Sequence, residues 1–312
     1  MSNEANSGNS VHSRDGTDVE RASRSPFRAT ISALLRDRLA LTGIIIVTLL
    51  ALAALFAPLI APQNPYDLAQ LDIMDNRLPP GSESMSGLYY LIGTDDQGRD
   101  LFSAILYGLR TSIIVGVSSA AIALVIGASL GLLSAYAGGK TDAILMRIVD
   151  IQLSFPAILI ALIFLAILGQ GVDKIILALV ITQWAYYART IRGSALVERR
   201  RSYVDAARSM ALPDRSILFR HILPNCLPPL IVVATMRVAY AIMLEATLSF
   251  LGIGLPVTEP SLGLLISNGF EYLLSGDYWI SFFPGLALLL LIVGINLIGD
   301  ALRDILNPRR EG

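Results

Sequence analysis

The sequence predicts an all-α, polytopic membrane protein with six transmembrane helices. Of its 312 residues, 54% are hydrophobic and only 16% are charged. A soluble domain needs more polar surface than this composition can supply. Long apolar runs and an uneven distribution of arginine are the other two observations behind the prediction.

Six apolar runs approach or reach the roughly 20 residues that cross a bilayer core as a helix. The fourth run is the shortest, and its polar Gln183 indicates a helix packed inside a bundle. An even number of spans places both termini on one side of the membrane. The expected spans are 41–61, 112–136, 148–168, 175–188, 227–250 and 280–298.

The positions of the charges predict which side each loop faces, because Lys and Arg accumulate in cytoplasmic segments. Arginines gather before the first span, in 189–224 and at the C-terminus. The segment 62–110 carries three arginines against seven acids, and 252–279 carries acids but no Lys or Arg. The first three segments are therefore expected in the cytoplasm and the last two outside. The expected organisation is a disordered cytoplasmic tail at 1–38, a first helix at 39–62, an outer segment at 63–110, a five-helix core at 111–300 that includes a cytoplasmic hairpin at 198–224, and a tail at 301–312.

Catalytic and metal-binding chemistry finds no support in the residue types. A single cysteine, Cys226, cannot form an intrachain disulfide, and two histidines without further cysteines do not make a zinc or iron site. The triplet 139–141 is Gly-Lys-Thr, but position 134 is serine and a membrane helix precedes it, so it does not match a phosphate-binding loop. No catalytic residue, cofactor, metal or nucleic-acid partner is expected.

Two short motifs predict local structure. Gly127 and Gly131 are four residues apart in a span, a spacing that favours close helix packing over the hydrolase motif that 127–131 also fits. Thr94 and Gln97 have the spacing of a capping box for a helix that enters from outside. The apolar run 262–266 is too short to span and is expected to be re-entrant or interfacial.

The polar stretch 202–225 is expected to form a helical hairpin. Val204, Ala207 and Ala211 share one face of the first helix. Pro213 suits the start of a second helix, and Pro224 is expected to end it.

The second helix of this hairpin carries an apolar stripe of Ile217, Leu218 and Ile222. A solvated loop that only obeys the charge rule is the alternative. An ordinary connector would be shorter and would lack two amphipathic faces. With no part of its own chain expected to cover it, the stripe predicts a partner groove.

The hairpin resembles the EAA loop of bacterial ABC importer permeases. The matching positions are Asp205, Ala206 and Ala207, then Ala211, then Ile222, Leu223 and Pro224. Asp205 stands where that pattern usually has Glu, and Ala211 where it usually has Gly; alanine suits a helical turn there if the backbone is not left-handed. Separated stretches such as 91–113, 245–256 and 296–309 also resemble the C-type permease of dipeptide, oligopeptide and nickel importers.

This resemblance implies a type I ABC importer permease fold in the bacterial inner membrane, with several spans and both termini in the cytoplasm. It implies a second permease subunit, two ATP-binding subunits, a periplasmic solute-binding protein and membrane lipid as partners. The residues of the EAA-like pattern would couple the chain to an ATPase subunit, which supplies the hydrolysis. Peptides are the expected substrates, while nickel, glutathione and other small polar solutes stay open.

Two charges in the fifth span need partners. Arg237 lies midway along it, and Glu245 follows eight residues later, too far around the helix for a direct pair. Because an intramembrane charge is costly, both are expected to face a protein interior or a water-filled path. A structural interhelical pair and a translocation pathway both fit.

Two other function classes remain open from the residues alone. A secondary transporter driven by an ion gradient would show broken helices in two repeated halves, and no repeat is evident. A membrane scaffold would have an interior without lone charges, which Arg237 argues against.

Overall fold

The computed structural model describes residues 26–67, 71–84 and 87–306. In these parts the chain is mostly helical, as predicted. A short antiparallel pair, β1 (Ser82–Glu83) with β2 (Tyr89–Tyr90), and the 3-10 turns η2 (Ile73–Asp75) and η4 (Leu273–Ser275) lie in the loops. The helices are α2 (Pro26–Leu34), α3 (Arg38–Leu55), α4 (Ala57–Ile60), α5 (Leu101–Ala137), α6 (Gly139–Leu153), α7 (Ala157–Leu168), α8 (Val172–Glu198), α9 (Ser202–Ser209), α10 (Asp214–Ser216), the π-helical η3 (Ile217–Ile222), α11 (Leu223–Phe250), α12 (Leu262–Phe270) and α13 (Trp279–Ile305).

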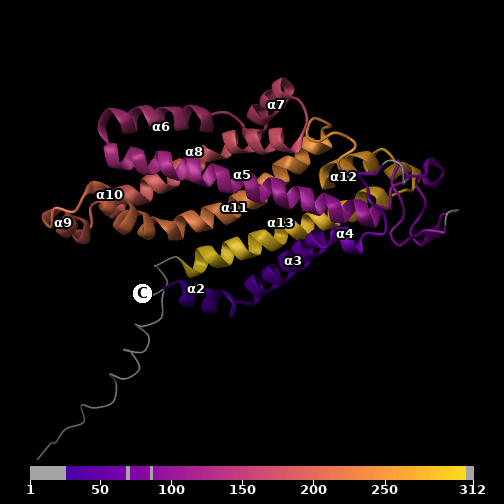
Figure 1. The fold of residues 1–312 in the computed structure, drawn as a ribbon, viewed down its shortest axis with the longest axis horizontal. Coiled ribbons are helices and arrows are strands. Elements are labelled where there is room, and N and C mark those ends of the chain that lie inside the picture. The colour runs from indigo at the N-terminus through magenta and orange to yellow at the C-terminus, as the bar shows by residue number, and fades with distance from the viewer. Residues whose placement is uncertain (1–25, 68–70, 85–86, 307–312) are drawn as a thin grey trace, which may run out of the picture.

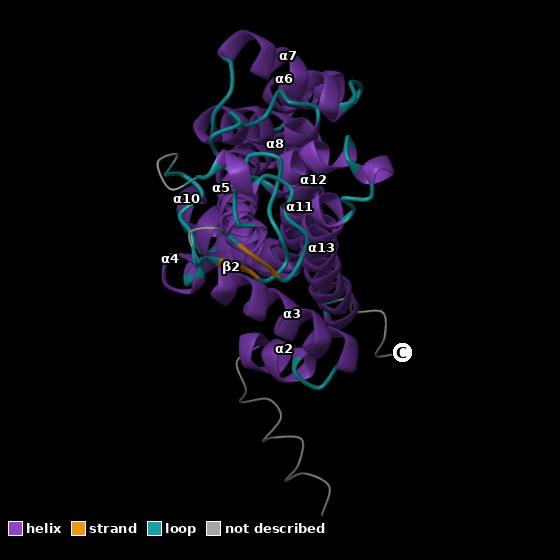
Figure 2. Cartoon of the chain, turned by 90° about the vertical axis from the view of Figure 1, so that its right-hand side faces the viewer, coloured by secondary structure: helices purple, strands orange, loops and turns teal. Residues whose placement is uncertain are grey.

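The long helices α5, α8, α11 and α13 run along the length of the molecule (Figure 1). The short helices α9 and α10 lie at one end, and the loops between α4 and α5 lie at the other. Helix α3 packs against α13 on one side of the bundle, while α6 and α7 cover α8 on the opposite side (Figure 2). The two candidate sites, the hairpin and the middle of α11, therefore lie along one continuous helical path.

The six expected spans are not all confirmed by helix length and apolar character. Within the described residues, four helices are long and apolar enough to cross a membrane: α3, α5, the continuous helix Asp214–Phe250, and α13. The pair α6 and α7 adds a fifth only if it counts as one span. Helix α8 is 27 residues long but too polar to meet the same criterion. Gln183 on α8 is fully buried, as predicted for a helix inside the bundle.

The expected span at 148–168 is not a single straight helix. Helices α6 and α7 meet there at a bend of 88°. Pro156 caps the second helix and follows Phe155, and a residue before proline is forced out of the helical region by contact with the proline ring. The segment is apolar enough to cross a membrane, but its backbone bends sharply between the two helices.

Helix α5 packs directly on α8, and two glycines make this possible. A Cβ atom added at Gly127 would collide with the Trp184 carbonyl oxygen, and one added at Gly131 would collide with the Ala188 carbonyl oxygen. Both neighbours are backbone atoms and cannot rotate away. The prediction that these glycines mark close helix packing is confirmed.

The expected capping box at Thr94 is wrong. Helix α5 begins at Leu101, and Asp100 caps it by accepting a hydrogen bond from the Ser103 amide at 2.8 Å. The Thr94 hydroxyl instead donates to the Asp75 carbonyl oxygen at 2.6 Å and accepts from the Leu78 amide at 2.7 Å. The loop before α5 folds back on itself, so the helix starts later than the motif suggested.

The tail expected to be disordered over residues 1–38 contains helix α2, Pro26–Leu34. Its neighbour α3 begins at Arg38, with Asp37 accepting hydrogen bonds from the Leu39 and Ala40 amides at 2.8 and 2.9 Å. The remaining part of that prediction, residues 1–25, lies outside the described residues.

Candidate functional site

The predicted hairpin is present at one end of the bundle (Figure 1). Helix α9 leads into a turn at 210–213, and α10 then continues through the π-helical η3 into α11. Pro224 was expected to stop the second helix, and this expectation is wrong. The Leu223 amide bonds to the Leu218 carbonyl, five residues back. This wider turn precedes Pro224, which lacks the N–H that a regular helix would use.

The turn of the hairpin forces an alanine into a left-handed conformation. Ala211 has φ of +54°. Its amide donates to the Arg208 carbonyl at 2.9 Å, and the Leu212 amide donates to the Ala207 carbonyl at 3.2 Å. This pair of bonds is the Schellman motif, in which the left-handed position favours glycine. The condition under which alanine would fit, a backbone that is not left-handed, is therefore not met.

The coupling residues expected in the hairpin divide into an exposed and a buried group. Ala206 and Ala211 are exposed, and the Asp205 side chain is 69% exposed, with its Oδ1 3.8 Å from Nη1 of Arg208. Ala207 is buried. The other three, at the end of the second helix, are the buried Ile222, the half-buried Leu223 and the exposed Pro224.

The apolar stripe of the second helix is buried within the chain, so the expectation that it needs a partner groove is wrong. Ile217 and Ile222 are 2% and 3% exposed. They pack in one cluster with Val204 of α9, Ile191 of α8 and Leu132 of α5. The chain covers this stripe itself, since the hairpin folds back onto the ends of α5 and α8.

Two large apolar side chains on the hairpin are exposed, and neither belongs to the predicted site. Met210 is 68% exposed in the turn, and Phe219 is 60% exposed on η3. Phe219 also lines a groove of about 360 Å³ together with Leu133 and Tyr136 of α5 and Leu218. The sequence did carry a signal for Phe219: it is a large apolar residue beside Arg220, on the side of the helix opposite the buried stripe.

Side-chain hydrogen bonds connect the hairpin to the bundle. The Tyr203 hydroxyl donates to Glu198 Oε2 at 2.6 Å, and the Asn225 amide donates to the Tyr203 hydroxyl at 3.2 Å. Burial and the bond to Glu198 raise the pKa of Tyr203 to about 12. Arg199 Nη1 donates to the Ala135 carbonyl at 2.9 Å, which satisfies an open acceptor at the end of α5. These bonds join α9 to α8 and α11, and they join the end of α8 to α5.

Glu245 lies deep in the bundle, near the end of α11. It is fully buried and accepts hydrogen bonds from the Ser112 hydroxyl at 2.9 Å and the Ser249 hydroxyl at 2.8 Å. Its hydrogen-bond partners are hydroxyls, so the structure gives no ion pair for this residue within the described part of the chain.

Arg237 lies at mid-helix in α11 and is half-buried. Its guanidinium carbon is 3.3 Å from the centre of the Tyr186 ring on α8 and 5.2 Å from that of Tyr240. Across residues 26–67, 71–84 and 87–306, no carboxylate lies within the 4.0 Å of an ion pair. Aromatic faces therefore hold this charge.

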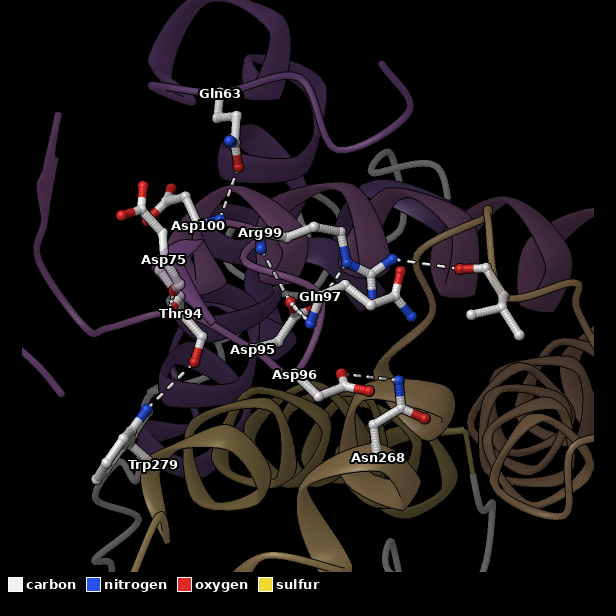
Figure 3. Close-up of polar contacts among 11 residues, drawn as sticks. Gln63, Asp75, Thr94, Asp95, Asp96, Gln97, Arg99, Asp100, Asn268 and Trp279 are labelled. Atoms are coloured by element: carbon white, nitrogen blue, oxygen red, sulfur yellow. Dashed lines mark hydrogen bonds and ion pairs between the residues drawn. The ribbon is translucent and has the colours of Figure 1, made fainter. Parts of the chain in front are cut away.

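The opposite end of the molecule is tied together by buried polar contacts (Figure 3). Arg99 Nε donates to Asp95 Oδ2 at 2.6 Å, and both side chains are almost fully buried. The Trp279 indole N–H donates to the Thr94 carbonyl at 3.3 Å, which joins this loop to α13.

The outer loops also reach the segment that follows α11. Arg99 Nη1 donates to the Val257 carbonyl at 3.3 Å, and the Asn268 amide donates to Asp96 Oδ1 at 3.4 Å (Figure 3). The short run 262–266 lies within α12, where Leu262, Leu264 and Leu265 are buried. The contacts of α12 with α11 and α13 fix its position.

These features define a multi-pass helical membrane protein with an exposed helical hairpin at one end. Residues 123–312 match the family model described as the binding-protein-dependent transport system inner membrane component. Residues 25–80 match the N-terminal transmembrane domain of oligopeptide transport permease C. The chain belongs to the binding-protein-dependent transport system inner membrane component family.

Curated relatives cover almost the whole chain. A putative peptide transport system permease of Brucella abortus is 41% identical over 286 residues, 92% of this chain and 93% of the relative. A probable D,D-dipeptide transport system permease of Escherichia coli is 40% identical over 88% of this chain and 89% of the relative. The solved inward-facing MetNI methionine ABC transporter aligns with a TM-score of 0.54 and 22% identity, over 65% of this chain and 96% of that one.

The family membership decides between the function classes left open by the residues. The chain is a permease subunit of a binding-protein-dependent ABC transporter in the inner membrane, and the chain itself is a transport component. Such a subunit works with ATP-binding subunits and a second permease. The ion-gradient alternative loses its support, and the type I importer fold is confirmed by the likeness to the MetNI permease.

Proposed function

We propose that the chain imports peptides that a periplasmic binding protein delivers, with a second permease beside it and two ATP-binding subunits below it. Relatives named for peptide and D,D-dipeptide transport support the substrate class. The observation that carries the coupling role is the exposed end of the hairpin. Asp205, Ala206 and Met210 leave a face there that the chain does not cover.

The orientation follows from the charges. The arginine-rich hairpin faces the cytoplasm with both termini, and the acidic loops at the other end of the bundle face the periplasm. In this orientation the parts are a tail at 1–38, a first span near 39–62, an outer segment near 63–110, a core at 111–300 with the coupling hairpin at 198–224, and a second tail at 301–312. Lipid covers the apolar outer faces of α3 and α7.

The mechanism is alternating access. Closure of the ATP-binding subunits pushes on the hairpin through Asp205, Ala206 and Ala211. Ala207 and Ile222 transmit the push because they are buried against the bundle, and Leu223 and Pro224 begin α11 directly. A packed interface shifts between discrete arrangements, so a small push becomes a rocking of α8 and α11. Arg237 faces the translocation pathway, and Glu245 holds the helices beside it.

The first test is purification of the chain from detergent-solubilised membranes of its own bacterium. The proposal expects a second permease and ATP-binding subunits to co-purify. In proteoliposomes with the binding protein, the complex should take up a peptide only when ATP is supplied. A homo-oligomer without ATPase activity would contradict the proposal.

The coupling residues have a sharper test in the same complex. Asp205→Arg reverses a charge at the exposed face, and Ala206→Trp places a bulky ring there. Both substitutions should abolish uptake while the chain still inserts in normal amounts, because neither side chain packs inside the chain. Glu83→Arg reverses an exposed charge at the outer end and serves as the control. Normal uptake by the two hairpin variants would defeat the coupling assignment.

A further inference from the structure

The middle of α11 carries a positive charge whose N–H groups have no hydrogen-bond acceptor among the described residues. The guanidinium of Arg237 lies over the Tyr186 ring at 3.3 Å from its centre. A stacked guanidinium keeps its N–H groups in the plane parallel to the ring, so stacking leaves them free to donate sideways. A carboxylate is the group that matches this fork of donors.

The neighbouring face of α8 adds a second, independent observation. Gln183 and Tyr187 lie one helical turn apart and are 0% exposed. Both polar atoms of the Gln183 amide and the Tyr187 hydroxyl have no hydrogen-bond partner among the described residues. Tyr187 also lies within electrostatic reach of Arg237. A native interior rarely leaves such groups unpaired without a functional reason.

These groups occupy the same level of the molecule. Arg237 and Tyr240 lie near the middle of α11, and Gln183, Tyr186 and Tyr187 lie near the middle of α8. The two helices pack against each other. A charge at this depth costs free energy unless it faces an aqueous path or a counter-ion. Transporters commonly place their solute contacts at this level of the bilayer.

We propose that Arg237, held by Tyr186 and Tyr240, is a transient binding site for the carboxylate of the transported solute. Gln183 and Tyr187 are enclosed in this structure and would add hydrogen bonds from the α8 side only in a state of the transporter that opens them to the solute. The inference rests on the proposed peptide import and adds to it the group that the pathway recognises, the C-terminal carboxylate of a peptide. Because a passing solute must also leave, a single arginine without a fixed counter-ion suits the role.

The test compares two probes in proteoliposomes that carry the complete transporter with its binding protein. One probe is tri-alanine, and the other is its C-terminal amide, which lacks the negative charge. The quantity measured is the uptake of the acid divided by the uptake of the amide. The binding protein contributes the same preference to every variant, so a change in this ratio reports the permease alone.

Arg237→Gln should lower the ratio roughly tenfold, the value of one lost charge-assisted hydrogen bond, with uptake of the amide nearly unchanged. Arg237→Lys should keep part of the preference because it keeps the charge. The control is Arg189→Gln on the same helix as Tyr186, where the arginine is 55% exposed and paired with Asp150. This control should leave the ratio as in the wild type.

Three other outcomes are informative. An equal loss of uptake for both probes, with less co-purified second permease, would mean that Arg237 pairs with an acid of that subunit, and it would overturn the site. An unchanged ratio with normal uptake would overturn it as well. If the wild-type complex took up neither probe, the proposed peptide import itself would fail, and the site with it.

Discussion

The two ends of this molecule treat charged side chains in opposite ways. At the outer end, Arg99 and Asp95 are buried and bonded to each other, and Asp100 caps α5. At the hairpin end, the Asp205 side chain is 69% exposed and Phe219 is 60% exposed. The buried charges of the outer end are therefore paired largely within the chain, while its loops still expose apolar side chains such as Ile73 and Met74. The hairpin end leaves both charge and apolar surface uncovered by the described residues.

This difference predicts where a substitution will act. A change in the buried outer network should damage the fold, because a buried charge that loses its partner is strongly destabilising. A change on the exposed hairpin face should spare the fold and act on association, because little of that surface is used within the chain.

The largest effect is expected for Arg99→Leu. It leaves the fully buried Asp95 carboxylate without its cation, at a cost of about 3–5 kcal/mol in the free energy of unfolding. The thermal midpoint of the detergent-solubilised chain and the amount of inserted protein both measure this. Arg77→Leu is the control, since Arg77 is 40% exposed and 3.6 Å from Asp277, and its loss should cost less than about 1 kcal/mol. Equal effects would remove the contrast between buried and exposed pairs.

The second effect concerns the hairpin. Phe219→Ser should weaken binding of the ATP-binding subunit by about 2 kcal/mol, roughly thirtyfold, because exposed aromatic anchors dominate such interfaces. The thermal midpoint of the isolated chain should not fall. Phe270→Ser removes a ring that is 62% exposed on α12 and should leave that binding unchanged. A lower midpoint with unchanged binding would show that Phe219 serves the fold.

Composition and periodicity predicted the fold class and the helix packing well. The apolar runs located α3, α5, α11 and α13, and the spacing of Gly127 and Gly131 identified the contact with α8. The bend at Pro156 was missed, because hydropathy measures how apolar a segment is and carries no information on backbone direction. The path of the helix through Pro224 was missed for a related reason. A π-helical turn avoids the regular hydrogen bond that proline breaks.

The site was predictable only in part. The pattern located the hairpin but treated the stripe of Ile217 and Ile222 as open, whereas the ends of α5 and α8 cover it. Contacts between segments far apart in the chain decide such burial, and one helix seen alone cannot reveal them. The stacking of Arg237 on Tyr186 was not predicted for the same reason, because the ring comes from another helix.

The third effect is smaller and has the opposite sign. Ala211→Gly should stabilise the hairpin by about 1 kcal/mol, because glycine adopts the left-handed conformation at φ of +54° without the contact between Cβ and the backbone. Slower hydrogen exchange in α9 would measure the gain. Ala206→Gly is the matched control in the middle of the same helix, where glycine should cost a similar amount. Slower exchange in both variants would contradict the idea that the left-handed backbone at Ala211 is what destabilises the hairpin.

The smallest effect is expected at Asp96 in the outer loops. Burial, with the nearby Asp95 adding to it, raises the pKa of Asp96 above its ordinary value of 3.8. Ionised Asp96 is thus less favourable in the folded loop than in the unfolded chain, so its penalty is present at neutral pH and disappears as the pH falls below 3.8. Asp96→Asn removes the charge and keeps a side-chain oxygen for the amide of Asn268.

Asp96→Asn should therefore be more stable than the wild type at pH 7, within about 0.5 kcal/mol. The two proteins should converge near pH 3, where both side chains are neutral. The thermal midpoints of both solubilised proteins across this pH range measure the difference in stability. Other titrating groups affect both proteins alike, so their effects cancel when the two midpoints are subtracted. A wild type more stable than the variant at pH 7 would mean that the Asp96 charge supports the outer loops, and the buried network would then tolerate charge better than its geometry indicates.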